Sequence, residues 1–217
     1  MTFQKNDFIE IDFTAKTKDG NIFDSTIKEN IDNAELKIQA KPFVFSLGQG
    51  MFLEGVEDFL IGKDENQKEH KIELSAENAF GKRDPKLIQT MPLKLFREHK
   101  INPIPGFSLN FDGRIGKILS ATGGRVKIDF NNPIAGKDVI YEVNVLRKIE
   151  DLNEKISSFT EFLFKRKIDF EIKDKKLILE VEKPLIQFAQ MFADKYKEIF
   201  DLDLEVKEKE IEKTDKN

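Results

Sequence analysis

The apolar positions near the start of the chain alternate with polar ones in a pattern that predicts a half-buried strand. Between residues 9 and 16 every second side chain is apolar, and the side chains between them are charged or carry a hydroxyl. This period of two places one face of an extended segment against a core and the other face in water. Residues 43–47 and 139–145 repeat the alternation, and Asp19 with Gly20 has the composition of a hairpin turn. We therefore expect several antiparallel strands.

A short helical pattern interrupts these strands. Phe52, Val56 and the adjacent pair Phe59 and Leu60 recur at the spacing of one helix face, and Gly62 follows at a position typical of a helix end. A further strand is expected at residues 70–75. Antiparallel strands with one short helix predict an α+β fold rather than repeated strand–helix–strand units with a parallel sheet.

Residues 86–130 are too many to form a simple loop between the strands at 70–75 and 139–145. They begin with a helical turn or two at residues 91–100. Three strands are then expected, with Asp112-Gly113 and Gly123-Gly124 at the turns between them. We interpret residues 86–130 as an inserted small β-rich domain. Residues 1–85 plus 131–149 would then form the discontinuous body that carries it.

The last third of the chain has a different pattern. Residues 151–167 predict an amphipathic helix capped by Asp151, residues 169–182 a hairpin, residues 184–200 a second helix opened by Pro184, and residues 202–206 a strand before a charged tail. We predict a separate C-terminal α+β domain over residues 150–217. The apolar face of its second helix has two interpretations, internal packing on the hairpin or self-association of two chains into a homodimer.

Composition and charge argue against two classes of binding partner, nucleic acids and membranes. Residues 150–217 hold 14 Lys and Arg against 18 Asp and Glu, which leaves 22 of each in residues 1–149. A neutral body with an acidic end lacks the basic footprint of a nucleic-acid-binding protein. No run approaches the roughly 20 apolar residues of a membrane span, and the first residues lack the layout of a signal peptide. We expect a cytoplasmic protein with neither nucleic-acid nor membrane partners.

The residues of common enzyme chemistries are missing from the sequence. There is no cysteine, and the two histidines, His70 and His99, have no further ligand at metal-binding spacing. The motifs typical of serine hydrolases, P-loop proteins and dinucleotide-binding domains are also missing. We therefore expect no metal and no cofactor. The sequence does use phenylalanine 20 times and tryptophan not at all, and any single one of these rings is expected to lie in the core.

Four segments, taken in order, resemble an FKBP-type peptidyl-prolyl isomerase. They are DGNIFDST at 19–26, PFVFSLGQGMFLEGVEDFLIG at 42–62, ENAFGKRDP at 77–85 and NNPIAGKDVIYEV at 131–143. Their order and spacing are similar to the SlyD-like subfamily, which carries a domain inserted in the flap. The extra C-terminal domain is similar to that of the long archaeal members. The resemblance implies an antiparallel half-barrel sheet around the short helix, with an apolar pocket between them.

The resemblance also implies which residues line this pocket. The catalytic residues would be Phe13, Asp24, Phe43, Phe80 and Tyr141. The substrate-binding residues would be Phe23, Met51, Phe52, Leu53 and Val56. Asp24 has a second interpretation, because an aspartate there can also cap the turn at Ser25 and Thr26. The family usually has a tyrosine where Phe80 stands. Other members have a tyrosine where Phe13 stands and often a larger ring where Val56 stands, so the pocket departs from the family pattern at these three positions.

The implied activity is the cis–trans isomerisation of X-Pro bonds in unfolded or partly folded proteins. Rotation about this amide passes through a twisted, less polar state, and the general amide barrier is about 18–20 kcal/mol. A dry aromatic pocket stabilises that state by differential binding, and no acid, base or nucleophile is required. The alternative is a chaperone or holdase with a weakened prolyl pocket, which the departures at Phe80 and Val56 favour.

The insert implies a second activity. In the subfamily it binds unfolded chains and supplies chaperone activity, and the candidate client-binding residues here are Met91, Leu95, Phe96 and Ile104. A domain of about 45 residues cannot bury all its apolar side chains, so an exposed apolar groove of the kind that marks a binding surface is expected. The alternative is that these residues form the small core of the insert. A third interpretation of the whole chain is a dimeric scaffold assembled through its C-terminal domain.

Overall fold

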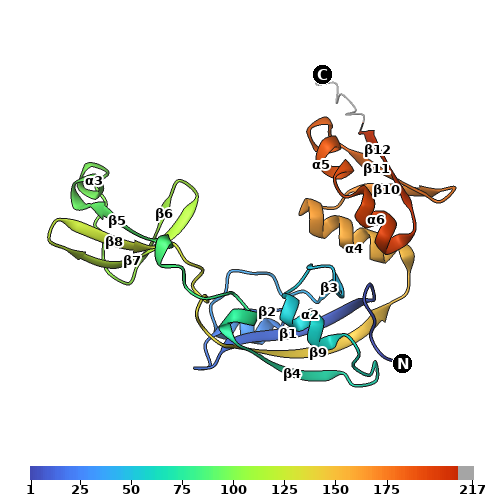
Figure 1. The fold of residues 1–217 in the computed structure, drawn as a ribbon, viewed down its shortest axis with the longest axis horizontal. Coiled ribbons are helices and arrows are strands. Elements are labelled where there is room, and N and C mark those ends of the chain that lie inside the picture. The colour runs from blue at the N-terminus through green and yellow to red at the C-terminus, as the bar shows by residue number, and fades with distance from the viewer. Residues whose placement is uncertain (210–217) are drawn as a thin grey trace. The chain divides into compact units, whose positions relative to one another are not determined.

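The computed structural model describes residues 1–209, and Figure 1 shows how the chain is ordered in it. These residues belong to two compact units. Unit 1 comprises Met1–Thr14, Ser25–His70 and the chain from Glu142 onward, and unit 2 comprises Ala15–Asp24 and Lys71–Tyr141. Each unit is described by itself below. Residues 210–217, which include most of the predicted charged tail, lie outside the described range.

The largest sheet has five strands. They are β1 (Phe8–Thr17), β2 (Ile22–Ser25), β3 (Phe43–Ser46), β4 (Glu69–Leu74) and β9 (Val139–Ile149), in the order β2-β1-β9-β4 with β3 paired to β1. The alternation predicted for β1 is confirmed, since Ile9, Ile11, Phe13 and Ala15 are all buried. Strand β3 runs antiparallel to β1, with Ile11 opposite Phe43. Antiparallel strands with few helices confirm the predicted mixture of α and β structure.

Two short helices accompany this sheet. Helix α2 (Glu54–Leu60) was predicted from its spacing, and its buried apolar side chains are Val56 and Leu60. Helix α1 (Lys28–Asn33) was not predicted. The reason is visible in its residues, because Ile31 is its only buried side chain and one apolar residue cannot produce a helical period.

Residues 88–129 form a sheet of their own in unit 2. Its strands are β5 (Ile88–Pro92), β6 (Ser108–Phe111), β7 (Arg114–Thr122) and β8 (Arg125–Asp129), in the order β5-β8-β7-β6. The three-stranded meander was predicted and β5 was not. Helix α3 (Leu93–Glu98) begins only after Pro92, so Met91 belongs to β5 instead of the predicted helical turn. The extent of an inserted domain over residues 86–130 stays a prediction.

Tight packing explains one glycine of this sheet. A Cβ atom at Gly116 would lie 2.6 Å from the side chain of Ile128 and 2.7 Å from that of Phe130. Such contacts are shorter than carbon atoms tolerate, so the position accepts only glycine. The core beside it consists of Phe96, Ile118, Val126 and Ile128, which are all buried.

Between β9 and residue 209, the described chain contains three α-helices and a second small sheet, all within unit 1. Figure 1 shows these elements. Helix α4 (Leu152–Phe164) begins after Asp151, whose carboxylate accepts a hydrogen bond from the backbone N–H of Glu154 at 2.8 Å, as predicted for an N-cap. Strands β10 (Asp169–Lys173) and β11 (Lys176–Val181) form the expected hairpin. Strand β12 (Asp203–Glu208) adds to β11 in parallel.

The prediction of one continuous helix over residues 184–200 is wrong. The segment divides into a 3-10 turn, helix α5 (Ile186–Gln190) and helix α6 (Ala193–Phe200). The two helices pack on different aromatic partners. Phe188 packs on Phe164 with ring centroids 5.4 Å apart, whereas Tyr196 packs on Phe159 at 5.2 Å. Met191 and Phe192, which lie between α5 and α6, are neither glycine nor proline, so the sequence carries no signal for this break.

Packing ties these helices to the first strand of unit 1. The ring of Phe200 lies 5.7 Å from that of Phe8, and Arg147 of β9 donates hydrogen bonds to both Glu10 of β1 and Glu154 of α4. The division of the chain at residue 150 stays a prediction. No helix among residues 1–209 is both long and apolar enough to cross a membrane.

Candidate functional site

Four phenylalanines of unit 1 form an aromatic cluster, which consists of Phe13, Phe43, Phe45 and Phe52. The ring of Phe52 lies 5.0 Å from that of Phe13, 5.4 Å from that of Phe43 and 5.3 Å from that of Phe45. Phe13 and Phe45 are buried, whereas Phe43 and Phe52 are half-buried. The cluster therefore offers two accessible rings backed by two buried ones, which is an apolar surface rather than a closed core.

The local sequence explains why these rings meet. Phe43 and Phe45 are two residues apart on β3 and share a face, so their rings stack at 5.5 Å. The loop that follows reverses the chain with Gly48 and Gly50 at φ values of +74° and +69°, a conformation in which glycine is favoured. This reversal returns Phe52 to the face that Phe43 and Phe45 occupy.

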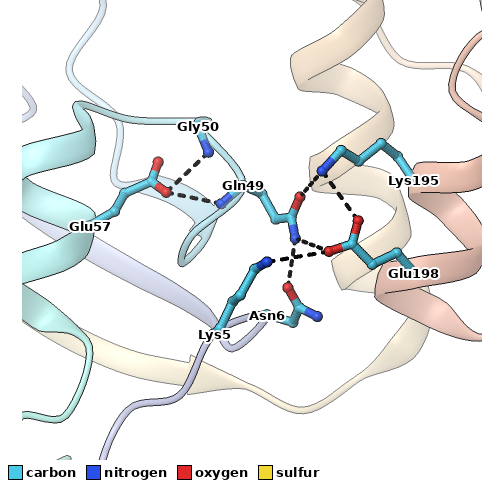
Figure 2. Close-up of polar contacts among 7 residues, drawn as sticks. All are labelled: Lys5, Asn6, Gln49, Gly50, Glu57, Lys195 and Glu198. Carbon is cyan, nitrogen blue, oxygen red and sulfur yellow. Dashed lines mark hydrogen bonds and ion pairs between the residues drawn. The ribbon is translucent and has the colours of Figure 1, made fainter.

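A buried carboxylate fixes the same loop. The Glu57 side chain of α2 is only 1 % exposed. Its two oxygens accept hydrogen bonds from the backbone N–H groups of Gln49 and Gly50, both at 3.1 Å, and of Phe52 at 2.6 Å. Figure 2 shows the first two of these bonds. Because three N–H groups share one carboxylate, the backbone at Phe52 is held in one place.

The side chain of Gln49 extends this network to helix α6 (Figure 2). Its amide nitrogen donates to Asn6 at 2.7 Å and to Glu198 at 3.4 Å, and its amide oxygen accepts from Lys195 at 2.9 Å. The hydrogen bond from Lys195 is the largest influence that lowers the pKa of Glu198. The chain after residue 150 thus contacts the loop that carries Phe52.

We predict that Glu57→Ala destabilises the protein and weakens substrate binding together. Removal of the carboxylate leaves three N–H groups without their acceptor, and hydrogen bonds to a charged group are worth about 1.5–3 kcal/mol each. We expect the free energy of unfolding in denaturant to fall by about 3 kcal/mol, with a smaller loss in Glu57→Gln, which keeps one oxygen. Asp58→Ala, an exposed change on the same helix, serves as the control. Equal stability of Glu57→Ala and Asp58→Ala would contradict this role of Glu57.

The remaining predicted residues of unit 1 are divided by burial. Met51 and Val56 are buried, and the Met51 sulfur accepts a hydrogen bond from the backbone N–H of Ser46 at 3.3 Å. Leu53 is half-buried at the start of α2. Met51 and Val56 are therefore closed to solvent, whereas Leu53 is partly accessible.

The predicted residues of unit 2 form a second group, the Phe23 cluster, which consists of Phe23, Asp24, Phe80 and Tyr141. The ring of Phe23 meets that of Phe80 at 5.7 Å and that of Tyr141 at 6.2 Å, both edge to face. Burial, with a smaller contribution from the negative charge of Asp24, raises the pKa of Tyr141 well above its ordinary value. The Tyr141 hydroxyl therefore stays protonated at neutral pH and can donate a hydrogen bond.

A turn holds Phe80 in this cluster. Phe80 follows a 3-10 turn at Ala76–Asn78, and Gly81 after it has a φ of +73°. The carbonyl of Gly81 accepts a hydrogen bond from the backbone N–H of Gly136 at 2.8 Å. This bond joins the ENAFGKRDP segment to the NNPIAGK segment, so two of the four family-like motifs meet at one turn.

The two tyrosines provide a test of burial. The chain has no tryptophan, so tyrosinate absorbance reports Tyr141 and Tyr196 alone. Burial raises the pKa of Tyr196 to about 12, despite a hydrogen bond of 2.8 Å with Thr160 that lowers it. Because both folded pKa values exceed the unfolded value of about 10, the stability they contribute is complete below about pH 10 and is lost as pH rises further. We expect no tyrosinate at about pH 10 until denaturant is added; a half-titrated folded protein would contradict the burial.

The predicted client-binding residues of the β5–β8 sheet and its connections differ in how exposed their side chains are. Phe96 is 4 % exposed and belongs to the core, and Met91 is partly buried against that core. The prediction that Phe96 lies on an accessible surface is therefore wrong, because α3 turns its ring toward Ile118 and the other core side chains. Leu95 and Ile104 are 45 % and 46 % exposed. Phe107 and Ile115, which are more exposed than either, complete what we call the insert apolar surface.

Sequence reasoning missed Glu57 and Gln49. Glu57 lies in a helix beside exposed acidic residues, and the sequence does not distinguish it from them. Gln49 is uncharged and belongs to no pattern of alternating apolar and polar residues. Among the described residues, no group of three or more His, Cys, Asp or Glu side chains could hold a metal ion.

Two family models and several named proteins are similar in sequence to this chain. The family model described as FKBP-type peptidyl-prolyl cis-trans isomerase matches residues 1–108, and the model described as FKBP26, IF domain matches residues 89–134. The Escherichia coli K12 protein named FKBP-type 16 kDa peptidyl-prolyl cis-trans isomerase is 31 % identical over 147 residues, which cover 66 % of this chain and 91 % of that protein. The Methanocaldococcus jannaschii short-type peptidyl-prolyl cis-trans isomerase is 28 % identical over 145 residues, 65 % of this chain and 91 % of its own length.

Proposed function

Because this chain belongs to the FKBP-type peptidyl-prolyl cis-trans isomerase family, we propose that its aromatic cluster is the surface on which the proline of an X-Pro bond is turned. The observation that carries this proposal is the pair of half-buried rings, Phe43 and Phe52, held over the buried rings of Phe13 and Phe45. The enzyme is a peptidyl-prolyl isomerase, and its substrates are unfolded or partly folded chains with X-Pro bonds.

The chemistry needs little more than this surface. Amide rotation loses the double-bond character of the C–N bond, and the twisted amide is less polar than the planar one. Water favours the planar ground state, so an apolar surface that excludes water stabilises the twisted state relative to it. Uncatalysed exchange takes roughly 10–100 s, which leaves ample room for acceleration by this means.

We assign the Phe23 cluster to the same isomerisation reaction, in which it would supply the polar groups. Tyr141 is the only hydroxyl-bearing ring among the predicted aromatic residues, since Phe80 stands where the family usually has tyrosine. Its raised pKa keeps it a hydrogen-bond donor, and Asp24 supplies the adjacent negative charge. In this proposal Tyr141 donates its one hydroxyl proton to a carbonyl of the substrate, and the charge of Asp24 polarises the pocket beside it. The assignment rests on the family resemblance, which names residues in both clusters.

We further propose that residues 86–130 bind clients, as in the SlyD-like subfamily. The support is the insert apolar surface, where Phe107 is 63 % and Ile115 60 % exposed. Single exposed apolar side chains are common, but several on one small domain favour a binding surface. Residues 86–130 also carry eight Lys and Arg against three Asp and Glu, so clients with acidic segments are expected to bind best.

A holdase with a weak prolyl site is the second candidate, and the residue at position 80 favours it. Phe80 cannot donate the hydrogen bond that a tyrosine would supply. Val56, the other departure that favours it, is fully buried. The C-terminal helices give limited support to a homodimer, since Met191 and Phe188 are exposed while Tyr196 packs internally.

Two assays of the unmodified protein separate these candidates. The first follows cis–trans exchange in a short X-Pro peptide without a coupling protease, and the second follows aggregation of an unfolded client. An isomerase with a client-binding insert accelerates the first and suppresses the second. Suppressed aggregation with no acceleration of peptide exchange would favour the holdase.

A further inference from the structure

A cleft of about 410 Å³ lies between the residues that enter β3 and helix α4, both in unit 1. We call it the β3–α4 cleft. One wall comes from the β3 side and the other from α4. Its lining residues are Lys41, Pro42, Phe43, Val44, Ser158, Glu161, Phe162 and Lys165.

The cleft is continuous with the aromatic cluster through one side chain. Phe43 lines the cleft and also packs on Phe52, with ring centroids 5.4 Å apart. Phe43 is therefore shared by the two sites, and a chain whose proline lies on Phe52 can extend along the Phe43 ring into the cleft. This continuity identifies the occupant as the substrate chain itself.

The walls suit an apolar side chain. Pro42, Phe43, Val44 and Phe162 supply hydrocarbon, while Lys165 places its ammonium over the Phe162 ring at 4.2 Å. Lys41 and Lys165 are exposed at the edges, and Glu161 offsets part of their charge. Ser158 is the smallest side chain on the α4 wall, so it contributes space that a larger residue would fill.

Helix α4 is held firmly enough to form a permanent wall. Its Phe159 packs on Phe200 of α6 at 5.8 Å, and Phe200 packs in turn on Phe8 of β1 at 5.7 Å. Arg147 joins Glu154 at the start of α4 to Glu10 of β1. The cleft therefore exists before substrate arrives, and little ordering cost opposes its use.

We propose that the β3–α4 cleft is a subsite of the isomerase that binds an apolar side chain two residues from the substrate proline. This rests on the proposed function of the aromatic cluster. An extended chain advances about 3.3 Å per residue, so side chains on one face recur every 6–7 Å or so. The Phe52 and Phe43 rings lie 5.4 Å apart and Phe43 lines the cleft, so we infer that proline and the bound side chain are separated by one such repeat. The chain after residue 150 thereby contributes to substrate selection.

The test uses short peptides around an Ala-Pro bond, with leucine or glycine placed two residues before or two residues after the proline. We expect the unmodified enzyme to turn over the leucine peptide about tenfold faster in kcat/KM at one of these positions, as burial of one such side chain allows. Ser158→Phe fills the cleft and is expected to abolish this preference while it leaves the glycine peptide unchanged. Ser157→Phe, the same change one residue earlier and outside the cleft lining, keeps the preference.

Several outcomes would overturn the subsite. They are equal turnover of leucine and glycine peptides by the unmodified enzyme, or a preference that survives in Ser158→Phe. A preference that disappears as the protein concentration rises and the chain self-associates would assign the cleft to a second copy instead. If Ser158→Phe fails to fold, Phe162→Ala removes the neighbouring ring of the same α4 wall and must lower the preference. Failure of every peptide, the glycine one included, would contradict the proposed function rather than the subsite.

Discussion

Replacement of Phe52 by alanine is expected to lower kcat/KM for a short X-Pro peptide by about a hundredfold, which corresponds to roughly 2.7 kcal/mol of transition-state stabilisation. Phe52 is the ring that joins the cluster, because it contacts Phe13, Phe43 and Phe45. Its loss admits water to the position where the twisted amide must be shielded. Steady-state turnover of the peptide without a coupling protease measures the effect.

A matched control separates catalysis from stability. Phe59→Ala makes the same change in α2, where the ring contacts His70 at 6.0 Å and lies outside the aromatic cluster. Truncation of a buried phenylalanine costs about 3–5 kcal/mol of stability, so Phe52→Leu, which keeps most of the volume, is measured beside the alanine variant. Folded Phe52→Ala with unmodified turnover would remove the aromatic cluster from the mechanism.

Replacement of residues 86–130 by a short glycine-serine loop is expected to slow catalysed refolding of a proline-limited protein on the order of a hundredfold, because the client is no longer held near the prolyl site. Turnover of a short peptide should change by no more than about twofold, since a short peptide does not depend on such tethering. The two ends are close enough for a short loop. The backbone N–H of Asp84 donates to the Asn131 side chain at 2.8 Å, and that side chain donates back to the Asp84 carbonyl at 3.0 Å.

A milder variant tests the same idea without removal of a domain. Serine at Leu95, Ile104 and Phe107 makes the insert apolar surface polar and leaves the buried Phe96 core intact. It should reproduce most of the refolding defect. Unchanged refolding in both variants would exclude the insert as the client-binding element.

The sequence predicted those parts of the fold that depend on local pattern. The alternation in β1 identified its buried face, the spacing in α2 identified Val56 and Leu60, and the glycine turns identified the β6–β7–β8 meander. The family resemblance was needed to select Asp24 and Phe80, because neither lies on an amphipathic face with a readable period.

Tertiary contacts produced what the sequence could not predict. Glu57 is buried because three loop N–H groups need an acceptor, and this demand exists only after the loop folds over α2. The break between α5 and α6 falls at Met191 and Phe192, which carry no breaker signal, and the burial of Phe96 follows from the way α3 packs on its sheet. Apolar spacing records that a side chain will be buried, but not what it will be buried against.

In the proposed mechanism, the aromatic cluster of this isomerase accelerates X-Pro rotation without acid–base chemistry. The decisive measurement is NMR exchange spectroscopy on a short proline peptide, with catalytic amounts of the unmodified protein or of Phe43→Ala. We expect accelerated exchange at a rate that is constant from about pH 7 to 9, because Tyr141 stays protonated there, and a loss of that acceleration in Phe43→Ala. Equal acceleration by both proteins, or none by either while aggregation of a client is still suppressed, would contradict it.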